Sequence, residues 1–273
     1  MMDNTPDRPW FRFSLRAIFV VTALIAASSW VFVESSKAVK LERCRNNLKQ
    51  IGVAFQNYHD AFKHFPPAIT YDADGTPLYS WRLLLVPFLE STDIYLKYNR
   101  KESWDGPSNS KLSSRMLDCF RCPTSTGGRY ETNYVVVIGD QTAMPGSRAI
   151  RIREIIDGTS QTIMVVEVAN SGINWLEPRD MSLEEALKGV NPKDSDGLCI
   201  SSNHPGRAGV GYCDAHVEFL ENSTTPEQLK KLLTISGEEQ RIISGHTETR
   251  LKTKGGVKIR LKAEEPAAEQ KAE

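Results

Sequence analysis

The chain has 273 residues, 40% hydrophobic and 25% charged, which is typical of one globular domain with appendages and not of a disordered chain. Its 34 basic and 34 acidic residues cancel, and this balance argues against a nucleic-acid-binding protein. Five cysteines are too few for a disulfide-dense scaffold, and their odd number leaves at least one unpaired within the chain.

The N-terminal part is apolar. Residues 17–33 carry no charge, and three arginines precede them at positions 8, 12 and 16. A helix of this length reaches roughly 25 Å, so we predict a short cytoplasmic N-terminus over 1–12 and a single-pass transmembrane helix over 13–34. A cleaved signal peptide is the alternative, but the apolar run continues past a small-residue cleavage point. This reading predicts an inner-membrane protein with an extracytoplasmic head.

A narrow apolar stripe follows the predicted span. Its members recur every three or four residues, which predicts an amphipathic continuation of the helix over 35–65, ended by Pro66 and Pro67. The stripe consists of Leu41, Cys44, Leu48, Ile51, Phe55, Tyr58 and Phe62. A coiled-coil stalk is the alternative, but the bulky aromatic residues favour packing against a head.

Residues 66–236 are predicted to form an α+β head, with one long helix packed on a small antiparallel sheet. Ser80 is a predicted N-cap before a short helix that Pro87 kinks or stops, Ser182 and Glu185 form a predicted capping box, and Thr225 begins another helix. The predicted strands are Thr132–Gly139 and Thr162–Val168, with a hairpin over Ala208–Leu220 that turns near Asp214 and Ala215. The charged tail, 237–273, is predicted to be partly disordered.

The cysteines favour a structural role. Cys119 and Cys122 form a CxxC pair, which is half a zinc site or a redox pair, but no second CxxC accompanies it. A disulfide from Cys44 to Cys119 or Cys122 is the preferred reading, and its connectivity stays open.

No catalytic constellation is present in the sequence. His204, Asp214 and His216 invite a metal or acid–base hypothesis, yet an Asp in a hairpin turn and a His on a strand surface have structural explanations. No nucleophile-elbow, metalloprotease or phosphate-loop motif occurs. We therefore predict no enzyme, no cofactor and no metal ligands, and keep a zinc or thiol enzyme as a third hypothesis.

An ordered series of blocks resembles a bacterial, planctomycete-type pseudopilin-like domain of unknown function. The blocks include "CRNNLKQIGVAFQNYHDAFKHFPPA" from Cys44, "SWRLLLVPFLE", "WDGPSN", "FRCP", "DGTSQTIMVVEV" and "HPGRAGVGYCDAHVEFL". The family's C-terminal hallmark is His, nine residues, then Asp-Gly, associated with prepilin-type processing; His204 and Asp214 match it, while Ala215 replaces the glycine. The other residues that carry the resemblance are Asn46, Asn47, Trp81, Trp104, Asp157 and Gly158.

The resemblance implies an architecture similar to type IV pilins and type II secretion pseudopilins, in which a long helix is half anchor and half packed on a small sheet. Arg12 and Ala17 stand where prepilins have the cleavage-site glycine and a glutamate. We therefore expect a divergent member that stays anchored in the membrane.

The leading functional hypothesis is a non-enzymatic, membrane-anchored component of a secretion or envelope system. Its expected partners are the membrane and other pseudopilin-like or envelope proteins, with self-association through the N-terminal helix and no nucleic acid. The alternative is an anchored sensor or ligand-binding module with a pocket around Trp81 and Trp104.

Overall fold

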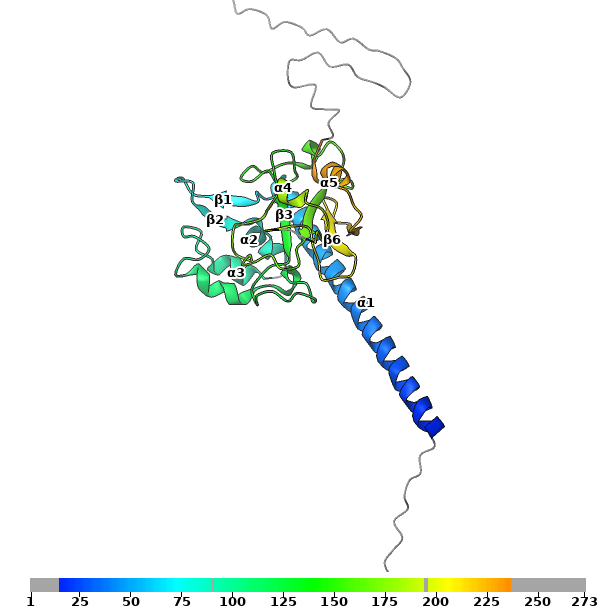
Figure 1. Ribbon diagram of the computed structural model, residues 1–273. Coiled ribbons are helices and arrows are strands. Elements are labelled where there is room, and N and C mark those ends of the chain that lie inside the picture. Colours follow the sequence, from blue (N-terminus) through cyan, green and yellow to red (C-terminus); the bar gives the residue numbers. More distant parts are fainter. Residues whose placement is uncertain (1–14, 90, 194–195, 237–273) are drawn as a thin grey trace, which may run out of the picture.

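The computed structural model describes residues 15–89, 91–193 and 196–236 as one long helix and an α+β head (Figure 1). The predicted cytoplasmic segment 1–12 and the charged tail 237–273 lie outside the described residues. The α+β class predicted from the sequence is confirmed.

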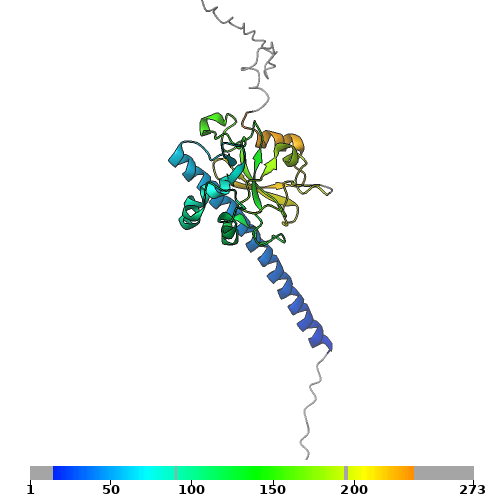
Figure 2. The same cartoon turned by 90° about the vertical axis from the view of Figure 1, so that its left-hand side faces the viewer.

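Helix α1, Leu15–Phe62, is a single helix of 48 residues. It is uninterrupted because no proline lies between Leu15 and Pro66, and it ends at Lys63, whose positive φ of 65° and N–H bond to the His59 carbonyl (2.7 Å) close the last turn. In both views the N-terminal part of α1 stands clear of the head, and the C-terminal part lies inside it (Figures 1 and 2).

The predicted stripe is the face of α1 that enters the head. Its members from Cys44 to Tyr58 are buried, whereas Leu41 is half-buried and Phe62 keeps 52% of its surface exposed. The stripe therefore ends one turn earlier than its spacing predicts, because the chain turns away after Lys63.

The transmembrane helix predicted over 13–34 is not found. Within the described parts of the chain, no helix combines the length and the apolar character needed to cross a membrane.

The head contains a five-stranded sheet of order β5-β3-β4-β6-β7 and a separate two-stranded sheet of β1 and β2. All neighbouring strands are antiparallel except β3 and β5. The strands are β1 Ile69–Tyr71, β2 Pro77–Ser80, β3 Tyr134–Ile138, β4 Ile163–Glu167, β5 Met181–Ser182, β6 Arg207–Tyr212 and β7 Val217–Glu221. The two predicted central strands and the predicted hairpin, now β6 and β7, are confirmed.

Short helices complete the head, and α4 and α5 pack against strands of the five-stranded sheet. Ser80 caps α2 through its hydroxyl, which accepts from the Arg82 N–H, and the capping box predicted at Ser182 is present. The helix predicted to begin at Thr225 is also present, and Thr225 forms a capping box with Gln228. These elements are α2 Trp81–Leu85, η1 Val86–Phe88, α3 Thr92–Lys97, η2 Asn109–Arg115, η3 Asp118–Phe120, η4 Ile152–Glu154, α4 Leu183–Ala186 and α5 Pro226–Leu233.

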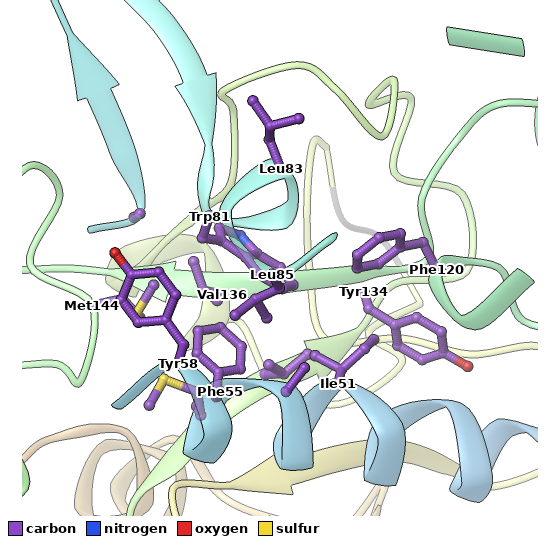
Figure 3. Close-up of a cluster of buried hydrophobic side chains, with 14 of the residues drawn as sticks. Ile51, Phe55, Tyr58, Trp81, Leu83, Leu85, Phe120, Tyr134, Val136 and Met144 are labelled. Carbon is purple, nitrogen blue, oxygen red and sulfur yellow. The ribbon is translucent and has the colours of Figure 1, made fainter. Parts of the chain in front are cut away.

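The sheet is apolar on both faces. Along β3, Tyr134 and Val136 face the cluster beneath α1, while Val135 and Val137 face the cluster beneath α4 and α5. This near-continuous apolar run is expected for a strand covered on both sides. Figure 3 shows the α1 side, where Ile51 and Phe55 of the helix meet Trp81, Leu85 and the sheet.

Helix α1 and the β6–β7 turn come into close contact at Gly52. A Cβ atom built on Gly52 would lie 2.9 Å from both Cα and Cβ of Ala215. Ala215 itself has a φ of 69°, a left-handed conformation that costs a non-glycine residue roughly 1 kcal/mol. The turn is thus held against the helix at a point where neither backbone has room to move.

We expect Gly52→Ala to destabilise the fold by about 1–3 kcal/mol, because the added methyl overpacks this contact. At an exposed helical position the same change would stabilise the protein by roughly 1 kcal/mol. The sign of the change in unfolding free energy therefore shows whether position 52 is tightly packed. Urea unfolding measures the effect, and adding Ala215→Gly should recover part of the loss. A Gly52→Ala protein as stable as the unmodified chain would show that the contact is loose.

Candidate functional site

A group of metal-ligating side chains converges inside the head at the place where α1 enters it. Cysteine sulfur, carboxylate oxygen and imidazole nitrogen atoms lie within 4.8 Å of one another, and all four residues are buried. We call this group the Cys/Glu/His cluster; it consists of Cys44, Cys122, Glu167 and His204.

Four different segments supply the cluster. Cys44 is on α1, Glu167 is the last residue of β4, and the other two residues lie in the loops that follow η3 and precede β6. The Cys44 sulfur is 3.2 Å from Glu167 Oε1, and the Cys122 sulfur is 3.6 Å from His204 Nε2.

Neighbouring polar groups orient the cluster. The Tyr134 hydroxyl is 3.0 Å from the Cys44 sulfur, and the Thr124 hydroxyl is 3.0 Å from the Cys122 sulfur. The Gly209 N–H donates to Glu167 Oε2 at 3.0 Å. A Cβ atom at position 209 would lie 2.7 Å from a Leu48 methyl and 3.0 Å from that carboxylate oxygen, so glycine allows the backbone to reach the cluster.

The cluster is electrostatically unbalanced. Interaction with Cys44, together with hydrogen bonds from His204 and Thr124, lowers the pKa of Cys122 to about 4. The pKa of Cys44 is raised, mainly by its interaction with Cys122 and secondly by burial. The pKa of Glu167 is raised as well, mainly by burial and secondly by the charge of Cys122. Among the described residues, no lysine or arginine forms an ion pair with any member.

A second buried polar group is centred on Arg82 of α2. Arg82 and Asp180 form a fully buried ion pair at 3.0 Å, and the Trp81 indole N–H donates to the same carboxylate at 3.1 Å. Burial raises the pKa of Asp180 to about 6, although the Arg82 charge lowers it. This group joins α2 to the segment before β5 and has no donor set for a metal.

The cysteines predicted to form a disulfide are all free thiols in the structure. Cys44 and Cys122 do come together, as that prediction required, but each sulfur has polar partners of its own in the Cys/Glu/His cluster. Cys119 is buried and lies outside the cluster, so the CxxC pair does not act as a unit.

The predicted motif residues are dispersed. His204 belongs to the cluster, whereas Asp214 accepts from His216 Nδ1 at 2.5 Å in the β6–β7 turn. Asp157 and Gly158 form the turn before β4, with a φ of 93° at Gly158.

The remaining motif residues are structural neighbours of the core. Asn47 donates to the Arg121 carbonyl at 2.8 Å and so holds the loop that carries Cys122, while Asn46 is exposed. Trp81 is buried against Phe55, and Trp104 is half-buried at the edge of the same core.

Glu167 is the site residue that sequence reasoning missed. Glu167 lies in the predicted valine-rich strand Thr162–Val168. The one sequence feature that could have indicated a site there is a single carboxylate in an otherwise apolar run. The sequence indicates His204 both as a motif residue and as a candidate for metal binding or acid–base chemistry, but with Asp214 and His216 and not with the cysteines. The segments that carry Cys44, Cys122 and His204 are too far apart in the sequence for a motif spacing to connect them.

Two surface hollows lie away from these groups. One is lined by the end of α1 and by η4, including His59 and Phe62, and the other by residues between η2 and Tyr130. Neither Trp81 nor Trp104 lines them, and neither does any member of the cluster.

Residues 42–149 match the model of a family described as "Protein of unknown function (DUF1559)". The matched range contains Cys44 and Cys122 and ends before Glu167 and His204. No curated protein and no solved structure matches the chain significantly. The resemblance to a domain of unknown function is therefore supported over this range, and the pseudopilin link and the His–Asp motif stay predictions.

Proposed function

We propose that the protein is a non-enzymatic assembly component of a secretion or envelope system that associates with further copies of itself through α1. The observation that carries this proposal is the part of α1 outside the head, residues 15–40, which we call the projecting segment (Figures 1 and 2).

The projecting segment presents large apolar side chains to solvent. Phe19, Leu24 and Ile25 keep 68%, 65% and 59% of their surface exposed, and Val20 and Val21 keep 59% and 53%. At about 100° per residue these five positions lie on several sides of the helix, not on one stripe. A helix apolar on several sides is stable in water only when other elements surround it.

A second copy offers the matching surface. Residues 17–33 carry no charge, so two projecting segments that meet along this stretch bury apolar area on both without like-charge repulsion within it. The architecture also agrees with the resemblance to pilins, in which subunits associate through such helices. The inner-membrane location predicted from the sequence stays a prediction.

Photo-crosslinking tests this proposal. A photoreactive phenylalanine analogue replaces Leu24 in the full chain, and the matched control carries it at Lys49, an exposed position on the same helix inside the head. After illumination of the purified protein, an adduct of two copies is expected from position 24 and not from position 49.

Two outcomes would contradict self-association. Equal adducts from both positions would indicate random collisions. Adducts from position 24 to phospholipid alone, in protein reconstituted into vesicles, would replace self-association by the membrane insertion that the sequence predicts.

A further inference from the structure

The Cys/Glu/His cluster has the dimensions of a tetrahedral metal site. With zinc at about 2.3 Å from sulfur and 2.0–2.2 Å from nitrogen or oxygen, the edges between ligands of a tetrahedron are about 3.3–3.8 Å. The two measured edges, 3.2 Å and 3.6 Å, agree with these values. No edge exceeds 4.8 Å, so closing around an ion requires side-chain shifts of only about 1 Å.

The donor set selects the metal. Two cysteine sulfurs and one imidazole are typical of zinc, whereas calcium and magnesium prefer oxygen ligands throughout. We propose that Cys44, Cys122, Glu167 and His204 bind one zinc ion in a closed structural site.

The burial of the four ligands indicates a structural zinc ion and not a catalytic one. Each member is at most 6% exposed, and neither surface hollow reaches the cluster. Four protein ligands fill a tetrahedral zinc and leave no position for water or substrate, which distinguishes structural from catalytic sites.

The surroundings suit a cation. Two cysteine sulfurs and a buried carboxyl lie within 4.8 Å of one another, and among the residues that the structure describes no lysine or arginine forms an ion pair with any of them. A divalent ion would supply the missing positive charge and favour the ionised forms of both thiols and of Glu167. The Tyr134 and Thr124 hydroxyls and the Gly209 N–H then act as second-layer donors to the ligands.

The site would fasten α1 to the head. Among the α1 side chains that the structure describes, Cys44 is the first buried one in chain order, and its three partners come from the sheet and the loops that surround that point. The zinc ion would therefore fix the direction in which the helix leaves the head, and its binding free energy would add to folding stability. This inference is independent of self-association.

Metal analysis of the full chain tests the proposal. The protein is purified under reducing conditions, supplied with zinc, desalted and measured by native mass spectrometry and elemental analysis. About one zinc per chain is expected for a single four-ligand site, and removal by a strong chelator should lower Tm. Cobalt in place of zinc should give the visible absorption of a tetrahedral thiolate site.

Matched variants locate the ion. Cys122→Ser and His204→Ala should lose the zinc, whereas Cys119→Ser removes a buried cysteine three residues away and should keep it. If the ligand variants fail to fold, the chelator and cobalt measurements on the unmodified chain still decide. Folded, reduced protein that takes up no zinc, a Cys44–Cys122 disulfide in the isolated protein, or equal zinc loss in Cys119→Ser would each overturn the proposal.

Discussion

Replacing Asp180 by alanine is expected to destabilise the protein by about 3–5 kcal/mol, because the change leaves the Arg82 guanidinium buried without a counter-ion. Both side chains are fully buried, and the guanidinium donates to the two carboxylate oxygens at 3.0 and 3.3 Å. The same carboxylate accepts from Trp81 Nε1 and from the Val136 N–H at 3.0 Å. One substitution therefore removes the acceptor for donors from α2 and β3.

Urea unfolding of Asp180→Ala and of a matched surface variant measures this effect. Asp93 also pairs with an arginine, Arg115, at 2.5 Å, but both partners are exposed, so Asp93→Ala should change stability little. Adding Arg82→Met to Asp180→Ala should recover part of the loss, since the uncompensated charge is then gone. If Asp180→Ala and Asp93→Ala lose similar free energies of unfolding, burial does not determine how much an ion pair contributes to stability, and the prediction is contradicted.

Replacing Phe55 by alanine is also expected to cost about 3–5 kcal/mol, the range for deleting a buried aromatic side chain. Phe55 is 1% exposed, and it joins α1 to the head by stacking on Trp81, with the ring centroids 5.0 Å apart (Figure 3). Its ring also meets that of Phe65 edge-on, with the centroids 6.3 Å apart. Alanine leaves a cavity among large rigid rings that cannot collapse onto it.

Phe62 provides the control for this prediction. It lies two turns further along α1 and is the same residue type, but 52% of its surface is exposed. Phe62→Ala should cost about 1 kcal/mol, in proportion to the smaller area buried. If both variants lose the same free energy of unfolding, the stripe of α1 does not stop contributing to the core after Tyr58, and the prediction is contradicted.

Sequence reasoning succeeded where the signal is local. The three-four spacing from Cys44 to Tyr58, the alternating residues of the β6–β7 hairpin and the cap at Ser80 each occupy a short stretch, and each is found in the structure. Strand β5, Met181–Ser182, was missed because two residues carry no periodicity, and its parallel pairing with β3 depends on the intervening chain.

The candidate site could not be predicted in the same way. Cys44 and Glu167 are 123 residues apart, and only the register of β4 against the helix brings their side chains together. The predicted disulfide pairs Cys44 with Cys119 or Cys122, so one of these two cysteines is expected near Cys44 from the sequence. The sequence offered no reason to add a strand-end carboxylate, because a single Glu beside valines also fits a solvent-facing strand position.

The continuity of α1 has a mechanical consequence. A helix without proline or other breaks from Leu15 to Phe62 behaves as a rigid rod over the roughly 40 Å of its projecting segment. A tilt of about 5° at its seat in the head would displace the far end by roughly 3.5 Å. Small changes in packing around Cys44 and Gly52 would thus cause a larger displacement of the N-terminal end of the projecting segment. Conversely, a force applied at that end would act on the sheet through the same lever arm.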